Sequence, residues 1–311
     1  MARRLALGTR SSALALTQAG LIKKHLEGRG LAVDLREFRT TGDRILDIPL
    51  SQIGDKALFT KELDHALLEG SIHLAVHSLK DLPTTLPRGI RIGAITSREE
   101  ARDVFVAHPD DEGSLAELPE GARIGTSSLR RKAQLLAWRS DLEVSPVRGN
   151  VDTRLRKLDG GDWDGLVLAY AGLARLGLSA RIREVIDTDV MLPAVGQGAL
   201  AVVCSEEDEE TYSVLRDGLH DEMVGREVEA ERAMLRRLEG GCSVPVGALA
   251  RTEAGKITLE GCVVSLDGRQ KIRARLEGPA DSPERIGEDL AEELLRKGAG
   301  AILAEIRETT V

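Results

Sequence analysis

Cys242 stands in a stretch of sequence that should form a loop. In LEGGCSVPVGA, residues 238–248, it follows Gly240 and Gly241 and precedes Pro245. Glycine opens backbone angles that other residues avoid, and proline fixes one. A cysteine in such a loop could be a nucleophile, a metal ligand, a buried small apolar residue or the anchor of a covalent group. A protease-like nucleophile would need a histidine and an acid within reach, and the sequence does not supply such a pair in an evident way.

Three other segments share one pattern, in which a strand ends, a small polar turn follows and a helix begins with arginine nearby. Ligands of open α/β sheets lie beyond the carboxyl ends of strands, and helix N-termini favour anions. Arginine adds a planar fork that matches carboxylates and phosphates. The pattern therefore predicts sites for several carboxylates or phosphates, with solvated surface arginines as the alternative. The segments are GTRSS (8–12), GTSSLRR (125–131) and VRGNVDTR (147–154), and their arginines are Arg10, Arg130, Arg131, Arg148 and Arg154.

Lys80 and Asp81 follow a short apolar strand, within HSLKDLPT at residues 77–84. Because they stand where that strand ends, they are expected at the same carboxyl-end edge as the first of these turns. Pro83 stops the chain from continuing as strand or helix. A carboxylate beside an anion site could stabilise a cationic intermediate or move a proton. A surface turn in which Asp81 pairs with Lys80 is the competing interpretation.

Other chemistry is poorly supported by the sequence. His73 and His77 share one face of a strand, but no carboxylate or cysteine completes a metal-binding set, so no metal is expected and both histidines are predicted to belong to the core or a sheet edge. The chain contains neither a Walker-type phosphate loop nor GxGxxG, and Gly196-Gln197-Gly198 is interpreted as a flexible crossover. Cys204 and Cys262 lie in apolar runs and are predicted to be structural.

Composition limits the class of protein. With 311 residues, 42% of them hydrophobic, the chain can bury two or three cores. A net charge of −8 argues against nucleic acid as a partner. No apolar run approaches the roughly 20 residues of a membrane span, and the start MARRLALGTR is interpreted as a first strand and not as a secretory signal. Three cysteines make a disulfide framework improbable, which indicates a reducing, cytoplasmic setting.

The order of elements predicts an α/β protein with a smaller α+β part. The first 80 residues alternate between strand and helix, in the order strand, helix, strand, helix, strand, and Ser11 or Ser12 caps the first helix. This alternation is typical of a parallel sheet. The same alternation of strands and helices is found again after about residue 100. Residues 192–204 are expected to cross back into the first unit. From about residue 222 a helix, a hairpin turning at Asp267-Gly268 and a helix with Ser282 at its N-cap are predicted.

Taken together, the segments resemble the porphobilinogen deaminase (hydroxymethylbilane synthase) family over nearly the whole chain. Six motifs occur in the family's order, which makes the match specific: GTRSSALALTQ, HSLKDLPT, GTSSLRRKAQL, VRGNVDTRLRKLD, LPAVGQGALA and LEGGCSVPVGA. The resemblance implies two α/β lobes like those of type II periplasmic binding proteins and a smaller C-terminal α+β domain. The implied boundaries are 1–98 with 192–218, 99–191 and 219–311.

The resemblance also implies a transferase of tetrapyrrole and heme biosynthesis. Four porphobilinogen molecules would lose ammonia and join head to tail on a dipyrromethane cofactor, and water would then release hydroxymethylbilane. The cofactor is implied to be a single dipyrromethane held by Cys242 through a thioether, and Asp81 is implied to be the catalytic residue. A cytoplasmic monomer with no membrane partner is expected, handing its product to uroporphyrinogen-III synthase without implied direct contact.

Further roles follow from the family's motifs. Cofactor binding is implied for Arg10, Ser12, Lys80, Thr126, Ser127, Ser128, Arg130, Arg131, Arg148 and Arg154. Binding of substrate and the growing oligopyrrole chain is implied for Arg10, Arg148, Arg154 and Arg175. A mobile loop is implied to include Lys56, Phe59 and Lys61.

Two other classes of protein compete with this prediction. A two-lobed protein that binds a small carboxylate without catalysis would have the same lobes, but the C-terminal domain and its loop cysteine would then have no purpose. A thiol enzyme with Cys242 as nucleophile would need a histidine partner. The mass of the purified chain separates them, since only the deaminase would carry a covalent pyrrole group.

Overall fold

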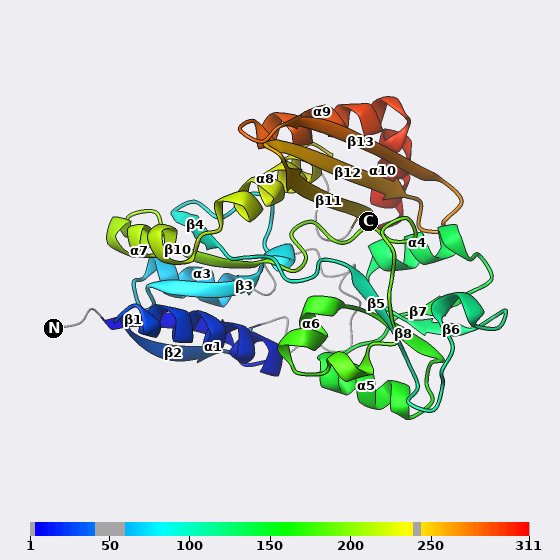
Figure 1. Ribbon diagram of the computed structural model, residues 1–311, viewed down its shortest axis with the longest axis horizontal. Helices are drawn as coiled ribbons and strands as arrows, with labels where there is room; N and C mark the ends of the chain where they lie inside the picture. Colours follow the sequence, from blue (N-terminus) through cyan, green and yellow to red (C-terminus); the bar gives the residue numbers. More distant parts are fainter. Residues whose placement is uncertain (1–3, 41–59, 239–243, 311) are drawn as a thin grey trace. The chain divides into compact units, whose positions relative to one another are not determined.

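The computed structural model describes residues 4–40, 60–238 and 244–310, and these form two compact units (Figure 1). The first contains residues 4–40, 60–99 and 199–225, and the second contains residues 100–198 and the described residues from 226 onward. None of the described helices has the length and apolar character that crossing a membrane requires.

The first unit is a five-stranded sheet in the order β2-β1-β3-β10-β4, covered on both faces. Leucines and valines of the strands pack against α1 and α7 in one buried core, and Leu63 of α3 lies on the other face, against Gly8. The strands are β1 (Arg4–Arg10), β2 (Ala32–Phe38), β3 (Leu74–Ser78), β4 (Ile90–Ile95) and β10 (Leu200–Ser205), and the helices are α1 (Ala13–Gly28), α3 (Lys61–Leu68) and α7 (Glu209–Leu219).

The second unit contains a sheet of the same topology, in the order β7-β6-β8-β5-β9. In both sheets, the first three strands are parallel and the fourth enters from a distant part of the chain. The strands are β5 (Asp103–Ala107), β6 (Arg123–Gly125), β7 (Glu143–Ser145), β8 (Gly165–Ala169) and β9 (Glu184–Val185), and the helices are α4 (Leu129–Trp138), α5 (Val151–Asp159) and α6 (Tyr170–Arg175).

The predicted α/β class is confirmed, but the expectation of a parallel sheet was wrong in one respect. β10 runs antiparallel to both β3 and β4, and β5 runs antiparallel to both β8 and β9. The reason is where the chain enters the sheet. Leu79 N, just after β3, donates to Ala199 O, just before β10, so β10 starts at the carboxyl end of β3 and runs back along it.

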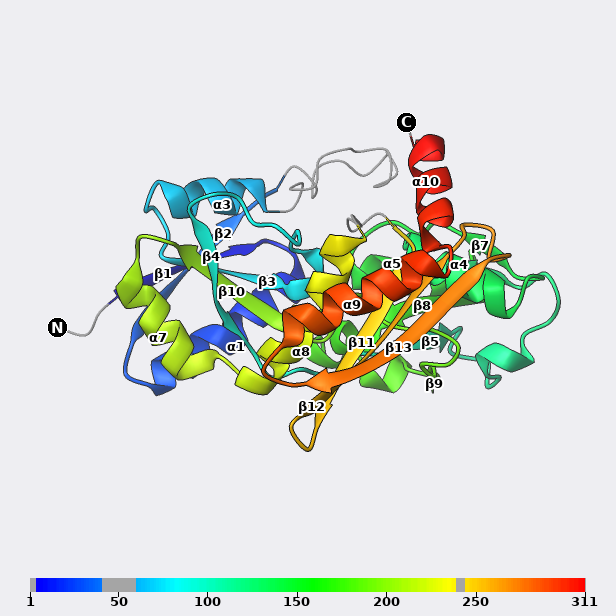
Figure 2. The same ribbon diagram turned by 90° about the horizontal axis from the view of Figure 1, so that it is seen from above.

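The rest of the second unit is a three-stranded antiparallel sheet, β11 (Val246–Glu253), β12 (Lys256–Val264) and β13 (Lys271–Pro279). One face packs on α8 (Glu222–Arg237), α9 (Pro283–Arg296) and α10 (Ala299–Thr310). Figure 2 shows α9 lying along this sheet. The other face packs against Ala133 of α4 and Leu192, so the C-terminal sheet shares a core with α4.

The local signals of the sequence were mostly sound. The hairpin turns at Gly268, whose φ of 76° suits glycine. Ser12 is the N-cap of α1 and accepts from Ala15 N. Ser282 stands at the N-cap of α9 and Pro283 follows it, but the Ser282 side chain makes no capping hydrogen bond. The predicted division into three domains stays a prediction.

Candidate functional site

A small pocket of about 50 Å³ lies at the carboxyl-end edge of the first sheet. We call it the Asp81 pocket. Its polar lining comes from the end of β1, the N-cap and first turns of α1, the end of β3 and the turn that follows β3. It consists of Arg10, Ser12, Gln18, His77, Ser78 and Asp81. The structure therefore brings together three of the residues singled out in the sequence: Arg10, Ser12 and Asp81.

Strand pairing explains why these residues meet. β1 and β3 are parallel neighbours, with Leu7 opposite Leu74, so their carboxyl ends reach the same edge. Arg10 ends β1, and Asp81 ends the single 3-10 turn Leu79–Asp81 that follows β3. Lys80 belongs to the same turn and is half-buried, but it is not among the residues that line the pocket.

Two residues of the pocket were not given a site role from the sequence. Gln18 of α1 is 4% exposed, and its Nε2 donates to Ser78 Oγ over 2.9 Å. This bond ties α1 to the end of β3. Helical spacing placed Gln18 on the buried face together with Ala19, Ile22 and Leu26, and a glutamine there was the available signal.

His77 is the second of these residues, and it is 5% exposed. Burial is the main cause that lowers its pKa to about 4, and the positive charge of Arg10 lowers it further. The imidazole is therefore neutral near pH 7. Its Nε2 is buried and has no hydrogen-bond partner among the described residues. The predicted core histidine is confirmed as buried, but it also lines the Asp81 pocket.

In the second unit, the turn between β6 and α4 carries the three predicted hydroxyl side chains. Ser128 is the N-cap of α4 and accepts from Arg131 N. Thr126 Oγ1 accepts from Ser128 N, and Ser127 Oγ donates to Val147 O over 2.6 Å. The last bond joins this turn to the one that follows β7, which pairs with β6 in parallel. The N-termini of α4 and α5 therefore lie at one edge of the second sheet.

The turn that follows β7 and the first turn of α5 hold the next two predicted arginines, Arg148 and Arg154. Asn150 caps α5 by accepting from Thr153 N over 3.0 Å. Arg154 Nε donates to Gly149 O over 2.8 Å, and Arg148 O accepts from Lys157 Nζ. Gly149 has a φ of 112°, where an added Cβ would also collide with Thr153, so the turn needs glycine.

Arg175 and the crossover segment are joined by a hydrogen bond. Arg175, at the end of α6, donates through Nη2 to Gly198 O over 2.5 Å. Gln197 is 1% exposed and donates to Ala101 O and to the Asp103 carboxylate. The interpretation of residues 196–198 as a flexible crossover was therefore wrong. Gly196 and Gly198 adopt positive φ angles, and buried hydrogen bonds hold the Gln197 side chain in place.

Arg130 and Arg131 are far less exposed than a surface interpretation allows, at 5% and 6%. Both form ion pairs with Asp103, which is fully buried. Burial opposes the charge of the Asp103 carboxylate, but the two guanidinium groups and Gln197 outweigh it and hold its pKa well below the usual range. No sequence signal singled out Asp103, because an acid at the head of an apolar strand is common.

Several predicted residues lie outside the described part of the chain or at its surface. Cys242, Lys56 and Phe59 lie outside the described residues. Lys61 is exposed at the start of α3. The other two cysteines are buried, and burial raises the pKa of both thiols, so the prediction that Cys204 and Cys262 are structural agrees with their surroundings.

The geometry defines an α/β protein with several candidate sites for carboxylates or other anions. In each unit, capped helices of eight residues or more begin beside arginines at the carboxyl ends of parallel strands. The first unit adds a carboxylate, a neutral histidine and an arginine around one small pocket.

Comparison with known families gives a more specific result. Residues 5–213 match the family model "Porphobilinogen deaminase, dipyromethane cofactor binding domain", and residues 226–296 match "Porphobilinogen deaminase, C-terminal domain". A porphobilinogen deaminase of Desulforudis audaxviator is 55% identical over 309 residues, covering 99% of each chain. One of Gloeobacter violaceus is 50% identical over 311 residues, covering 98% of this chain and 94% of its own. The chain belongs to the porphobilinogen deaminase family and is a transferase of tetrapyrrole biosynthesis that uses a dipyrromethane cofactor.

Two solved structures that resemble the chain do so weakly. A putative lipoprotein of Actinomyces odontolyticus has a TM-score of 0.44 at 18% identity, covering 72% of this chain and 93% of its own. A nutrient-binding protein of Burkholderia cenocepacia bound to methionine has a TM-score of 0.41 at 16% identity, covering 68% and 89%. Nothing about function follows from these similarities.

The residues present fit a dipyrromethane group. Its pyrroles carry acetate and propionate side chains, and the structure offers cations and hydrogen-bond donors that suit carboxylates. The most specific observation is in the Asp81 pocket, where the buried His77 Nε2 without a partner lies near the Arg10 charge. A buried polar atom without a partner is costly, and a bound polar group would offset that cost.

Proposed function

We propose that this chain joins four porphobilinogen molecules head to tail on its dipyrromethane cofactor and then releases hydroxymethylbilane by hydrolysis. In each addition, the C–N bond of the aminomethyl group breaks, ammonia leaves, and a C–C bond forms with loss of the pyrrole α proton. After four additions, one water molecule releases the tetrapyrrole, so four ammonia molecules are produced for each product. The cofactor supplies the pyrrole that primes the chain.

One observation carries this proposal: Asp81 lies in a single pocket with Arg10, Ser12 and the neutral His77. An anion-binding protein without chemistry needs the arginine and the helix N-terminus, but a carboxylate beside them would repel its ligand. A carboxylate does have a use when a cation forms in the reaction. Loss of ammonia from porphobilinogen leaves such a cation.

We assign the catalytic role to Asp81. Its carboxylate can accept a hydrogen bond from the pyrrole N–H of the substrate and stabilise the positive charge that develops as ammonia leaves. It can also return a proton to the leaving amine. Arg10 and Ser12 then hold a side-chain carboxylate of the substrate, which orients the aminomethyl group toward Asp81.

The second unit supplies further carboxylate binding in this proposal. Hydroxyl groups and free backbone N–H groups at the start of α4 and α5 are suited to acetate and propionate, as are the adjacent guanidinium groups. Arg148 and Arg154 are assigned to both the cofactor and the growing chain, and Arg175 is assigned to the growing chain alone. We assign cofactor binding also to Lys80, Thr126, Ser127, Ser128, Arg130 and Arg131.

We assign the covalent attachment of the cofactor to Cys242. Cys204 and Cys262 are fully buried, and burial raises the pKa of each thiol, which disfavours the reactive thiolate. Of the three cysteines, these two therefore make poor attachment points. Lys56, Phe59 and Lys61 are proposed to contact ligand, Lys61 from the start of α3. A cytoplasmic monomer that passes its product to uroporphyrinogen-III synthase completes the proposal.

The test is the intact mass of the purified chain, with Cys242→Ser as the matched control. We expect an excess equal to two linked pyrroles, absent from the control. A bare chain that gains this mass during incubation with porphobilinogen is an unloaded enzyme and agrees with the proposal. A bare chain that gains no mass and releases no ammonia is the alternative, a carboxylate-binding protein without catalysis.

A further inference from the structure

Asp103 forms hydrogen bonds and ion pairs with two of the arginines that are predicted to bind ligand, Arg130 and Arg131. Its Oδ2 accepts from Arg130 Nη1 over 2.7 Å, and its Oδ1 accepts from Arg131 Nε over 3.0 Å and from Gln197 Nε2 over 2.9 Å. All four residues are at most 6% exposed. A charge-assisted network so well shielded from water is strong and fixes the orientation of its members.

The position of Asp103 in the sheet places this network at the functional edge. Asp103 begins β5, and because β5 runs antiparallel to β8, it lies opposite Ala169, the last residue of β8. The carboxyl ends of β6 and β8, which pair in parallel, meet at this same edge. An acid at the start of an antiparallel strand therefore lies where the neighbouring parallel strands end.

Arg131 is fully engaged within this network. Its Nε donates to Asp103, its Nη1 donates to Val167 O over 3.0 Å, and its Nη2 lies 2.9 Å from Asp103 Oδ1. All three nitrogens of the guanidinium group thus have partners inside the protein. This arginine acts as a brace between α4, β5 and β8.

Arg130 is engaged on one side only. Its Nη1 donates both to Asp103 and to Leu192 O, each over 2.7 Å. Among the described residues, no hydrogen bond or ion pair engages Nε and Nη2, which form the side edge of the guanidinium fork. That edge is the one that grips a carboxylate with two parallel hydrogen bonds.

The net charge of this network also favours a ligand carboxylate beside Arg130. One carboxylate faces two guanidinium groups, so Asp103, Arg130 and Arg131 together carry a net charge of +1 in a buried place. Buried charges are normally paired. A ligand carboxylate on the remaining edge of Arg130 would complete the pairing.

We propose that Asp103 is a positioning residue for cofactor binding, which braces Arg131 and orients Arg130 so that its Nε–Nη2 edge receives a carboxylate of the dipyrromethane group. This inference rests on the proposed function. It revises the assignment of cofactor binding to both of these adjacent arginines: Arg130 binds the ligand, and Arg131 holds the site in shape. Gln197 supports Asp103 from the crossover segment through its hydrogen bonds to Asp103 and Ala101 O.

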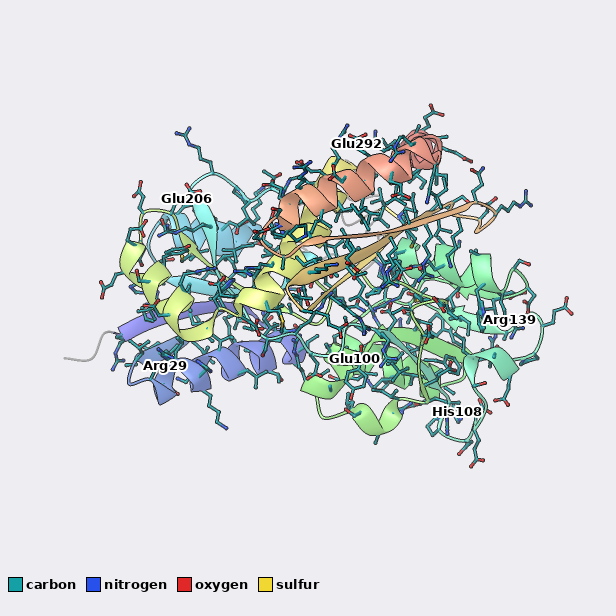
Figure 3. The ribbon with its side chains drawn as sticks, turned by 45° about the horizontal axis from the view of Figure 1, so that its top comes forward. Arg29, Glu100, His108, Arg139, Glu206 and Glu292 are labelled. Atoms are coloured by element: carbon teal, nitrogen blue, oxygen red, sulfur yellow. The ribbon has the colours of Figure 1, made fainter. Side chains whose placement is uncertain are left out.

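The test measures cofactor loading of unloaded chains by intact mass over a range of porphobilinogen concentrations. Asp103→Asn keeps the shape of the side chain but removes its charge. We expect it to raise the concentration for half-maximal loading about tenfold, the effect of weakening one charge-assisted hydrogen bond. Asp141→Asn is the matched control, because it removes an ion pair of the same unit, to Arg139 just beyond the end of α4 (Figure 3), and should load at the wild-type concentration.

Three additional variants keep the inference falsifiable if Asp103→Asn does not fold. Gln197→Met removes the N–H donors to Asp103 without removing a charge, and we expect a smaller rise, about threefold. Arg130→Lys should raise the half-loading concentration with little change in Tm, whereas Arg131→Lys should mainly lower the Tm of the unloaded chain, measured on a Cys242→Ser background.

The outcomes separate this inference from the proposed function. If the wild-type chain gains no pyrrole mass, the proposed function fails. If the wild-type chain loads, and folded Asp103→Asn or Gln197→Met chains load at the wild-type concentration with only a lower Tm, Asp103 is an ordinary structural ion-pair partner and the inference is overturned. Equal loading defects in Arg130→Lys and Arg131→Lys would also overturn the division of roles.

Discussion

At the scale of single residues, Asp81 separates an enzyme from a binding protein. Asp81→Asn keeps the shape of the side chain in the Asp81 pocket but removes the charge that would stabilise the developing cation. We expect turnover of porphobilinogen to fall about a hundred- to a thousandfold, the usual effect of removing a well-placed electrostatic stabiliser. Ammonia release under saturating substrate measures it.

The control for Asp81→Asn is Asp110→Asn, an exposed acid of the second unit. Both variants should unfold at the wild-type temperature, since Asp81 is exposed as well. Turnover within a few-fold of wild type in Asp81→Asn would remove Asp81 from the mechanism. A comparable loss in Asp110→Asn would mean that the assay responds to surface charge and not to the site.

His77 makes a second prediction at this scale, about stability and pH. Its pKa is lowered to about 4 in the folded chain, so the unfolded chain takes up a proton first as the pH falls. The stabilising contribution is present above about pH 6.5 and is lost progressively as the pH falls toward 4. From pH 7 to pH 5, this one group should cost about 2 kcal/mol of unfolding free energy.

Denaturant unfolding of wild type and His77→Gln at both pH values measures this cost. The variant lacks the titrating group, so its unfolding free energy should fall less between pH 7 and pH 5 than that of the wild type. The two losses should differ by about 2 kcal/mol. Equal losses in the two chains would mean that His77 is not held neutral by its burial and by Arg10.

At the scale of elements, the capped turns could be predicted from sequence, but the buried partners of their arginines could not. Ser12, Ser128 and Asn150 are local signals, because each N-cap accepts from a backbone N–H three residues along. Asp103 and Arg130 are 27 positions apart, and only strand pairing brings them together. His77 was predicted to belong to the core or a sheet edge, but its place in the pocket depends on β1 and β3 ending at one edge.

The N-caps allow stability and function to be measured separately. Ser128 caps α4 in the candidate site, whereas Asp208 caps α7, away from the Asp81 pocket, by accepting from Thr211 N over 2.9 Å. Ser128→Ala and Asp208→Ala should each cost about 1 kcal/mol of stability. Only Ser128→Ala should also raise the KM for porphobilinogen, because its hydroxyl and helix N-terminus are proposed to bind carboxylates. A raised KM in both variants would show that KM follows stability alone.

At the scale of the whole chain, the topology that the two α/β sheets share could be predicted only in part from the sequence. The alternation of strands and helices predicted the two α/β sheets, and the return of the chain to the first sheet is confirmed by β10. The predicted start of that return at residue 192 was too early, because residues 192–198 belong to the second unit. The antiparallel direction of β10 and β5 was missed, because a strand's own residues show whether it is buried but not which way it enters a sheet. The packing of α4 on the C-terminal sheet was also beyond the sequence, because the apolar residues involved are scattered from Ala101 to Val264.

The proposed ligand is a polyanion bound by a chain of net charge −8, so local positive charge must outweigh the overall repulsion. Binding should therefore stabilise the chain by pairing charges such as the net +1 around Asp103. We expect the loaded chain to melt several degrees above unloaded Cys242→Ser at low salt, at about 2–4 °C for each kcal/mol gained. The difference should shrink in 1 M salt, where the screening length falls to about 3 Å. Calorimetry at both salt concentrations measures it, and a difference that salt leaves unchanged would mean that apolar contacts, and not paired carboxylates, hold the cofactor.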